Sequence, residues 1–409
     1  MSVNLDVDWV RAQFPAFEVP ALQGKAFFEN AGGSFTSRFV IDRLTRFYTE
    51  RKVQPYAGYE ASSLGGAEMD EARSRLAAMM GVEPHRMNFG PSTSQNTYVL
   101  AQAFREYLSP GDAIIVTNQD HEANTGVWRR LSDHGIEVRE WRLEPETGYL
   151  DIASLTNLLD EKVKLVCFPH CSNIVGEIND IEAIVKVVHG AGAFSCIDGV
   201  SYAPHGFQNV GDLGADVYMF SAYKTYGPHQ GIMVLSDRLI DALPNQAHYF
   251  NAGSAYKRFT PAGPDHAQIA ACAGMADYVD ALYAHHVKTE VSATERNDAV
   301  HDLMRAAEID LLQPVLDYLS SKNSVRLLGP RVAKDKAPTI AIIPQTPPDE
   351  LAQKMVAENI MADGGDFYAV RCIEGQGEDP KRGVFRMSFV HYTTKDEVDQ
   401  LLNALDKHL

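Results

Sequence analysis

The sequence predicts an α/β fold in which a large domain with a mainly parallel sheet precedes a smaller C-terminal α+β domain. From about residue 70 to 240, short apolar runs of strand length alternate with segments of helical spacing. Uninterrupted apolar strands between helices are typical of a parallel sheet covered on both faces. After the helix-breaking Pro261-Ala-Gly-Pro264, long helical stretches replace this alternation. We therefore expect residues 1–24 to form an N-terminal segment, 25–280 the large domain and 281–409 the small domain.

The elements of the large domain follow from their apolar patterns in chain order. Runs such as Ala113-Ile-Ile-Val-Thr117 have the length and β-branched content of buried strands. The expected strands are 113–117, 136–141, 163–168, 193–198, 216–220 and 231–235. The expected helices are 68–80, 96–108, 125–134, 155–160 and 181–190.

The same reasoning gives the C-terminal elements. Helical stretches at 267–285 and 291–320 lead into shorter segments of both kinds. The expected strands there are 324–328, 339–343 and 384–390, and the expected helices are 349–358 and 395–405.

The composition excludes several classes of protein. The chain carries 37 basic and 54 acidic residues, a net charge of −17, which argues against nucleic acid or an anionic membrane as a partner. No apolar run approaches the ~20 residues of a membrane span, and the acidic N-terminus lacks the apolar region of a signal peptide. Five cysteines, an odd number mostly within apolar runs, indicate reduced thiols. We expect a cytoplasmic protein.

Lys224 and Asp198 are the most informative residues. Each follows a strand-like run, and the acid lies 26 residues before the lysine, so both are expected at the ligand-binding edge of the sheet. Pyridoxal phosphate (PLP) requires this pair: a lysine for a Schiff base with its aldehyde, and an acid that keeps its pyridine nitrogen protonated. Taken singly, a lysine after a strand is usually solvated, and such an aspartate is often a helix cap.

Three further segments have features of a PLP site. Gly90-Pro-Ser-Thr-Ser-Gln95 precedes a helix, and hydroxyls and free N–H groups at a helix start suit a phosphate. His121 could stack on a pyridine ring, and Asn173 could donate to the phenolic oxygen of PLP. The ordinary alternatives are N-capping, a surface histidine and a turn asparagine.

Several segments together resemble class V aminotransferases, a PLP-dependent family that includes cysteine desulfurases, selenocysteine lyases, kynureninases and isopenicillin N epimerase. The resemblance runs from about residue 25 to the C-terminus and is closest to the cysteine desulfurase-like branch. The segments that carry it are Phe28-Glu-Asn-Ala-Gly-Gly33, Asp120-His-Glu-Ala-Asn124, His170-Cys-Ser-Asn-Ile-Val-Gly176, Asp198-Gly-Val-Ser201 and Ser221-Ala-Tyr-Lys-Thr-Tyr-Gly-Pro228. It implies fold type I and a homodimer with active sites near the subunit interface.

The resemblance also implies residue roles. Lys224 would be the Schiff-base lysine, Asp198 the partner of the pyridine nitrogen, and His121 the stacking residue. Arg386 and Asn30 would bind a small amino-acid substrate, Arg386 by gripping its carboxylate. The cofactor-binding set is Thr93, Ser94, His121, Asn173, Asp198, Ser201, Ser221, Tyr223 and Lys224.

The chain departs from the family pattern at three positions. Ser201 stands where Gln or His is usual, and it is too short to reach the same partner. Tyr223 replaces a common histidine but can still offer its O–H to phosphate. Pro264 stands in a region where a threonine of the other subunit usually clamps the phosphate, and proline has neither hydroxyl nor N–H.

Cys372 decides between the expected activities. It lies 14 residues before Arg386, near the spacing of the mobile sulfur-accepting cysteine of desulfurases, but its neighbours differ from that pattern and favour a core cysteine. We expect a cysteine desulfurase or C–S lyase, with a class V aminotransferase or an amino-acid epimerase without a catalytic cysteine as the alternative. A binding protein that kept only the fold is a further alternative. A metal site could be suggested by Cys167, His170 and Cys171, but no second pair of ligands follows at a suitable spacing. We therefore expect no bound metal.

Overall fold

The computed structural model describes residues 4–409 of the chain. Its central feature is a seven-stranded sheet with the order β2-β8-β7-β6-β5-β3-β4. The strands are β2 (Met87–Gly90), β3 (Ala113–Thr117), β4 (Glu137–Trp141), β5 (Val163–Pro169), β6 (Phe194–Asp198), β7 (Val217–Ser221) and β8 (Gly231–Leu235). All neighbours pair in parallel except β8, which runs antiparallel to both β7 and β2. The expected mainly parallel sheet is confirmed.

Helices cover both faces of this sheet because its central strands are buried on both sides. One face packs on α4 (Thr93–Tyr107), α5 (Gly126–Arg129) and α9 (Asp237–Ala242). Helices of the other face are α3 (Glu60–Met79), α7 (Ile181–Gly190), α8 (Val210–Leu213), α10 (His266–Ala271) and α11 (Ala273–His286). The remaining helices before the C-terminal unit are α1 (Val7–Arg11), α2 (Arg38–Glu50) and α6 (Ile152–Thr156).

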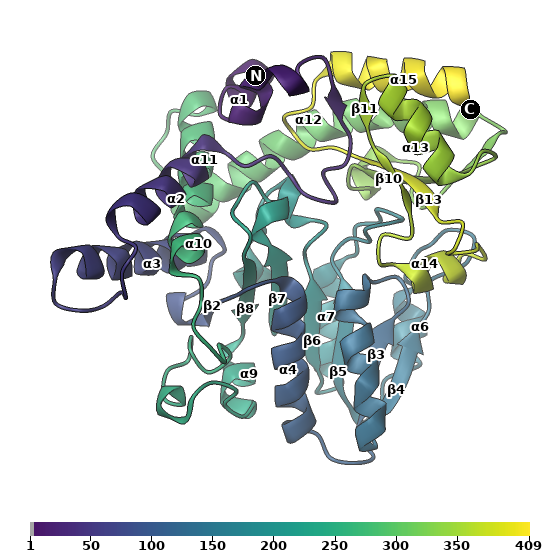
Figure 1. Cartoon of the computed structure of the whole chain (residues 1–409). Coiled ribbons are helices and arrows are strands. Elements are labelled where there is room, and N and C mark those ends of the chain that lie inside the picture. The colour runs from purple at the N-terminus through teal and green to yellow at the C-terminus, as the bar shows by residue number, and fades with distance from the viewer. Residues whose placement is uncertain (1–3) are drawn as a thin grey trace.

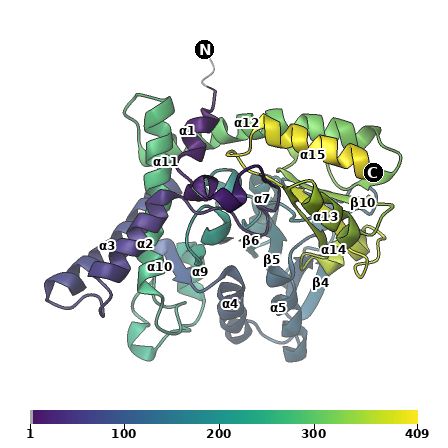
Figure 2. The same ribbon diagram turned by 45° about the horizontal axis from the view of Figure 1, so that its top comes forward.

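The C-terminal unit contains a four-stranded antiparallel sheet with the order β12-β13-β10-β9. Figure 1 shows this unit beyond one end of the large sheet, with α12 crossing above, and α12 and α15 lie side by side in both Figure 1 and Figure 2. Its strands are β9 (Val325–Leu327), β10 (Thr339–Pro344), β11 (Ile360–Met361), β12 (Asp363–Gly365) and β13 (Val384–Ser388). Its helices are α12 (Ala293–Ser321), α13 (Pro348–Ala357), α14 (Val370–Gly375) and α15 (Lys395–His408).

The N-terminal strand joins this C-terminal unit. β1 (Ala26–Phe27) pairs in parallel with β11, and Ala26 and Phe28 are buried in the core of the C-terminal sheet. The segment after β1 is thereby held between the two sheets. The domain boundary expected at residue 280 stays a prediction.

The structure corrects several expected helices. The stretch 125–134 is not one helix, because α5 is only one turn long and passes into a 3₁₀ turn, Arg130–His134. The helix expected at 155–160 begins and ends earlier, since Asp151 caps α6 by accepting from the N–H groups of Ala153 and Ser154. Within residues 4–409, no helix is long and apolar enough to cross a membrane, and no His, Cys, Asp and Glu cluster suits a metal ion.

Candidate active site

The carboxyl ends of four parallel strands meet around one cavity of about 110 Å³, the Lys224 cavity. Asp198 ends β6, and Lys224 ends the 3₁₀ turn that follows β7. His121 and Asn173 lie in the loops after β3 and β5. The cavity therefore occupies the usual ligand position of an open α/β sheet. It is lined by Ser92, Thr93, Ser94, Asp120, His121, Ala123, Cys171, Asn173, Asp198, Val200, Ser201, Ser221, Tyr223, Lys224 and His229.

Every residue expected to bind the cofactor lines this cavity, although the roles themselves stay predictions. Asp120, Cys171 and His229 also line it and were not expected to. Asp120 directly precedes His121 in the segment Asp120-His-Glu-Ala-Asn124, and this position could have identified it as a site residue. Arg386, Asn30 and Cys372 do not line it.

Lys224 lines this cavity and is partly buried. Burial, together with the positive charge of Arg386, lowers the pKa of its ammonium group from 10.5 to about 8, against the opposing effect of Asp198 and Glu29. Its backbone is fixed by Ser34, whose Oγ donates to the Lys224 carbonyl at 2.6 Å. The turn continues through Tyr226, which has a φ of +61° and a buried side chain. A left-handed backbone conformation is unfavourable for tyrosine, and the packing of the buried side chain must offset this cost. The surrounding structure therefore fixes the turn after Lys224.

Asp198 and Asp120 form a pair of buried acids. Burial raises the pKa of Asp198 from 3.8 to about 6, although its carboxylate accepts from the Val200 N–H at 2.8 Å. The pKa of Asp120 is raised well above 3.8 by burial and by the charge of Asp198. Asp120 accepts from the backbone N–H of His121 at 2.8 Å and from Nδ2 of Asn124 at 2.7 Å. It thereby positions the His121 turn.

His121 is held as a neutral ring. Its Nδ1 accepts from the Ala123 N–H at 3.0 Å, which leaves the ring proton on Nε2. Burial and the charges of Lys224 and Arg386 lower its pKa from 6.5 to about 3. A neutral aromatic ring of fixed orientation is suited to stacking on a flat ligand.

The N-terminus of α4 has the features of an anion site. Ser92 caps this 15-residue helix, and Thr93 Oγ1 lies 2.8 Å from Ser221 Oγ. Free N–H groups, the helix dipole and hydroxyls together favour a phosphate. Gly231 permits this arrangement, because a Cβ there would lie 2.4 Å from the carbonyl carbon of Ser92. Tyr223 stacks on His229 beside it, with ring centroids 5.0 Å apart.

The buried Arg386 and the partly exposed Glu29 form an ion pair next to the Lys224 cavity. Arg386 Nη2 donates to Glu29 Oε1 at 2.6 Å, and Nη1 donates to the Asn173 carbonyl at 3.3 Å. The Phe367 ring covers the guanidinium, whose central carbon lies 3.7 Å from the ring centroid. The carboxylate expected from a substrate is thus supplied here by the chain itself.

Asn30 and Cys372 have other surroundings. The Asn30 amide donates to the Phe27 and Ser388 carbonyls and accepts from the Tyr392 hydroxyl, so it ties β1 to β13. Cys372 is fully buried within α14, with Sγ 4.0 Å from Ser172 Oγ. Burial raises the pKa of its thiol from 9.0 to about 12.

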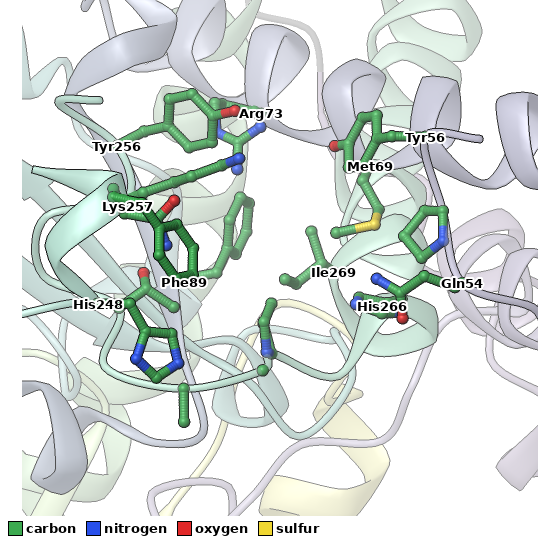
Figure 3. Close-up of a pocket in the computed structure, with 17 residues that line it drawn as sticks. Gln54, Tyr56, Met69, Arg73, Phe89, His248, Tyr256, Lys257, His266 and Ile269 are labelled. Carbon is green, nitrogen blue, oxygen red and sulfur yellow. The ribbon is translucent and has the colours of Figure 1, made fainter. Parts of the chain in front are cut away.

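Pro264 lies away from the Lys224 cavity, in a second pocket of about 460 Å³. Figure 3 shows Arg73 and Tyr256 on one side of this pocket and Gln54 and His266 on the other. Tyr249 and Phe250 are 89% and 69% exposed, and Phe250 lines the pocket. This part of the chain presents aromatic surface to its surroundings.

Comparison with known proteins agrees with this arrangement. The aminotransferase class V family profile matches residues 26–401. The chain is 33% identical to the aminotransferase-like protein FGM3 of Gibberella zeae, over 99% of both chains. It is 28% identical to a cysteine desulfurase of Pectobacterium atrosepticum, over 99% of this chain and 98% of that one.

Solved structures share the fold. The apo cysteine desulfurase of Thermococcus onnurineus NA1 superposes with a TM-score of 0.85 at 21% identity, over 99% of this chain and 98% of that one. A C-DES mutant with glycine covalently linked to its PLP cofactor superposes with a TM-score of 0.75 at 18% identity, over 97% and 98% of the two chains. The family match covers most of the sequence and includes every strand of the large sheet. The chain belongs to the class V aminotransferase family.

Proposed function

We propose that the protein is a PLP-dependent enzyme that acts at the carbon next to the amine of an amino-acid-type substrate, without a catalytic cysteine. The observation that carries the proposal is that Lys224 and the buried Asp198 line one cavity, with the pKa of the lysine lowered to about 8. Perturbed titratable groups in a cavity are a mark of catalytic sites.

The residues of the Lys224 cavity fit PLP. The N-terminus of α4, with Thr93, Ser94 and Ser221, would hold the phosphate, and Asp198 would hold the pyridine N–H. Asn173 Nδ2 donates one N–H to the Phe367 carbonyl at 3.0 Å, and its second N–H would donate to the phenolic oxygen. When bound, PLP supplies an electron sink that weakens the bonds around the substrate carbon.

The protein supplies attachment, orientation and proton transfer. At pH 7, roughly a tenth of a lysine with a pKa of about 8 is unprotonated, so Lys224 Nζ can bind a carbonyl carbon and carry a proton. The neutral His121 ring would cover one face of the bound ring. Arg386 donates to the carbonyl of Asn173, which lines the cavity, and with Glu29 it would face the carboxyl end of a substrate.

The setting of Cys372 supports chemistry without a protein thiol. A persulfide-forming cysteine needs a thiolate and access to the substrate, whereas Cys372 is fully buried with its pKa raised to about 12. Cys171 lines the cavity, but burial raises its pKa to about 12 as well. A cysteine desulfurase is the second candidate, favoured by relatives of that name at 26–28% identity.

We also propose a homodimer. Apart from Lys224, the lining of the cavity contains no lysine or arginine to neutralise a phosphate. A second copy docked on the aromatic surface around Tyr249 and Phe250 could supply one. Light scattering, which measures molar mass in solution, tests this on the wild type and on a Tyr249→Ser, Phe250→Ser double variant. We expect the mass of a dimer for the wild type and that of a monomer for the variant.

Product analysis tests the proposed activity. Purified holoenzyme would be mixed with L-cysteine, other L-amino acids and their amides, and the products identified by chromatography. We expect turnover that is lost in Lys224→Ala and stays within about twofold in Cys372→Ala, because only the lysine lines the cavity. Alanine and sulfide from L-cysteine, lost in both variants, would establish the desulfurase instead. Turnover that survives in Lys224→Ala would contradict both candidates.

A further inference from the structure

We propose that Glu29 makes the enzyme selective for substrates whose carboxyl group is an uncharged amide, as in an aminoacyl amide or the first residue of a peptide. This proposal rests on the proposed function, because it concerns the substrate of the same site. It makes Glu29 a specificity-determining residue, because the Glu29 carboxylate pairs with Arg386, which would otherwise bind the carboxylate of a free amino acid.

The fold fixes the position of the Glu29 carboxylate. Glu29 follows β1, and its backbone bridges to Ser388 at the end of β13, which carries Arg386. Gly32 leaves room for the carboxylate, since a Cβ at that position would lie 2.7 Å from Glu29 Oε1. The side chain is 25% exposed and that of Arg386 only 3%. The pair is therefore held by backbone pairing, rather than by two flexible surface side chains.

A free carboxylate would meet an arginine that is already neutralised. The 2.6 Å contact with Glu29 supplies one full negative charge to the guanidinium. A second carboxylate would have to displace Glu29 or share the arginine with it. Two carboxylates in one desolvated site repel each other, and moving a carboxylate from its buried partner leaves a charge uncompensated.

An amide group suits the two atoms of the ion pair that have no hydrogen-bond partner. Arg386 Nε is a buried donor without an acceptor, and Glu29 Oε2 is a buried acceptor without a donor. A carboxamide offers the complement, a carbonyl oxygen to accept and an N–H to donate. It brings no charge, so the Glu29–Arg386 pair stays intact. Unpaired buried polar atoms are costly, and satisfying both favours this ligand class.

Among residues 4–409, no carboxylate other than that of Glu29 forms a salt bridge with Arg386. Asp363, whose charge also raises the pKa of Arg386, lies opposite it in the β12–β13 ladder and is exposed. The other cation near the pair is Lys224, whose pKa is affected by the charges of both Arg386 and Glu29. Within the described part of the chain, Glu29 forms a salt bridge with Arg386 alone. Glu29 is thus the group that sets the charge next to the substrate's carboxyl end.

The test compares acids with amides by binding rather than turnover. L-alanine and L-alaninamide, and L-serine and L-serinamide, would be titrated into holoenzyme while the absorbance of the bound cofactor is followed. In the wild type we expect each amide to bind at least about tenfold more tightly than its acid. In Glu29→Gln, which keeps the shape but removes the charge, the acids should gain about tenfold and the amides change by less than about threefold.

Glu140→Gln is the matched control. Glu140 is also 25% exposed and paired with an arginine, Arg129, at 2.5 Å, but on β4 at the edge of the sheet. We expect this variant to leave all four dissociation constants within about twofold. If Glu29→Gln does not fold, the comparison of acid with amide on the wild type still decides.

Equal or tighter binding of the acids by the wild type would overturn the proposal. The proposed function would still stand in that case, provided that the cofactor absorbance is lost in Lys224→Ala. A wild-type protein with no cofactor absorbance would overturn both.

Discussion

The lowered pKa of Lys224 has a measurable consequence in the protein without cofactor. The unprotonated amine is the form that attacks an aldehyde, and its fraction rises as the pH passes through about 8. We expect the rate of PLP attachment, followed by absorbance after mixing, to increase about tenfold per pH unit below that value and to level off above it. A rate that keeps rising beyond pH 10 would show a lysine with its ordinary pKa.

Single residues could be predicted where the motif and the strand end coincide. Lys224, Asp198, His121 and Asn173 all line the cavity because parallel strands deliver their carboxyl ends to one edge. The Glu29–Arg386 pair could not be predicted, since the two residues lie 357 positions apart. Only the position of β1 against the C-terminal sheet brings them together.

The contact between β8 and α4 gives a prediction at the scale of elements. In Gly231→Ala the new Cβ would lie 2.4 Å and 2.6 Å from the carbonyl carbon and oxygen of Ser92, both backbone atoms. Overpacking of this kind typically costs about 1–3 kcal/mol. Because the anion site moves with the helix start, we expect affinity for PLP to fall by about tenfold. Equilibrium titration of cofactor into the apoprotein measures this.

Gly190→Ala serves as the comparison, since Gly190 ends α7 and a Cβ there would have no neighbour within 4 Å. Its affinity for PLP should match the wild type. Equal affinities for the two variants would contradict the proposed role of α4.

Elements with long apolar runs were predicted well, and short or polar ones were not. The six expected strands of the large sheet are present with ends shifted by at most one residue. β2 was missed because Met87-Asn-Phe-Gly90 is too short for a clear strand pattern, and it is a strand through its pairing with β8. The two-residue β1 and β11 likewise exist only as each other's partners.

A buried lysine links the two sheets at the scale of the whole molecule. Lys336 Nζ donates to the Val175 carbonyl at 2.5 Å and to the Leu328 carbonyl at 2.9 Å. This joins the loop that carries Asn173 to the C-terminal unit. Burial lowers the pKa of Lys336 from 10.5 to about 7.

The pH dependence of stability tests this link. From about pH 7 to 10 the unfolded chain holds the Lys336 proton and the folded chain does not, so stability should rise with pH. The rise from this group is at most about 1.4 kcal/mol per pH unit. We expect Lys336→Met to lose it, so that its deficit against the wild type in urea unfolding grows by about 1–3 kcal/mol between pH 7.5 and 9.5.

Lys354→Met, at a half-exposed lysine of α13 paired with Glu350, should keep the wild-type dependence of stability on pH. A deficit for Lys336→Met that is the same at both pH values would mean that Lys336 is charged in the folded protein.

The order of large sheet and C-terminal unit could be predicted from the change of pattern near residue 260. The return of the N-terminus to the C-terminal sheet could not, because the pairing of β1 leaves no local pattern in two residues. The proposed second subunit likewise leaves no pattern within one chain.

The most direct test of the account is to find which lysine binds the cofactor. Lys224 and Lys336 both have lowered pKa values, but only Lys224 lines the cavity with Asp198. Holoenzyme would be reduced with borohydride, digested and its peptides analysed by mass spectrometry. We predict that the reduced cofactor is on Lys224 alone, with loss of the cofactor absorbance. Attachment to Lys336, or to no lysine, would contradict the account.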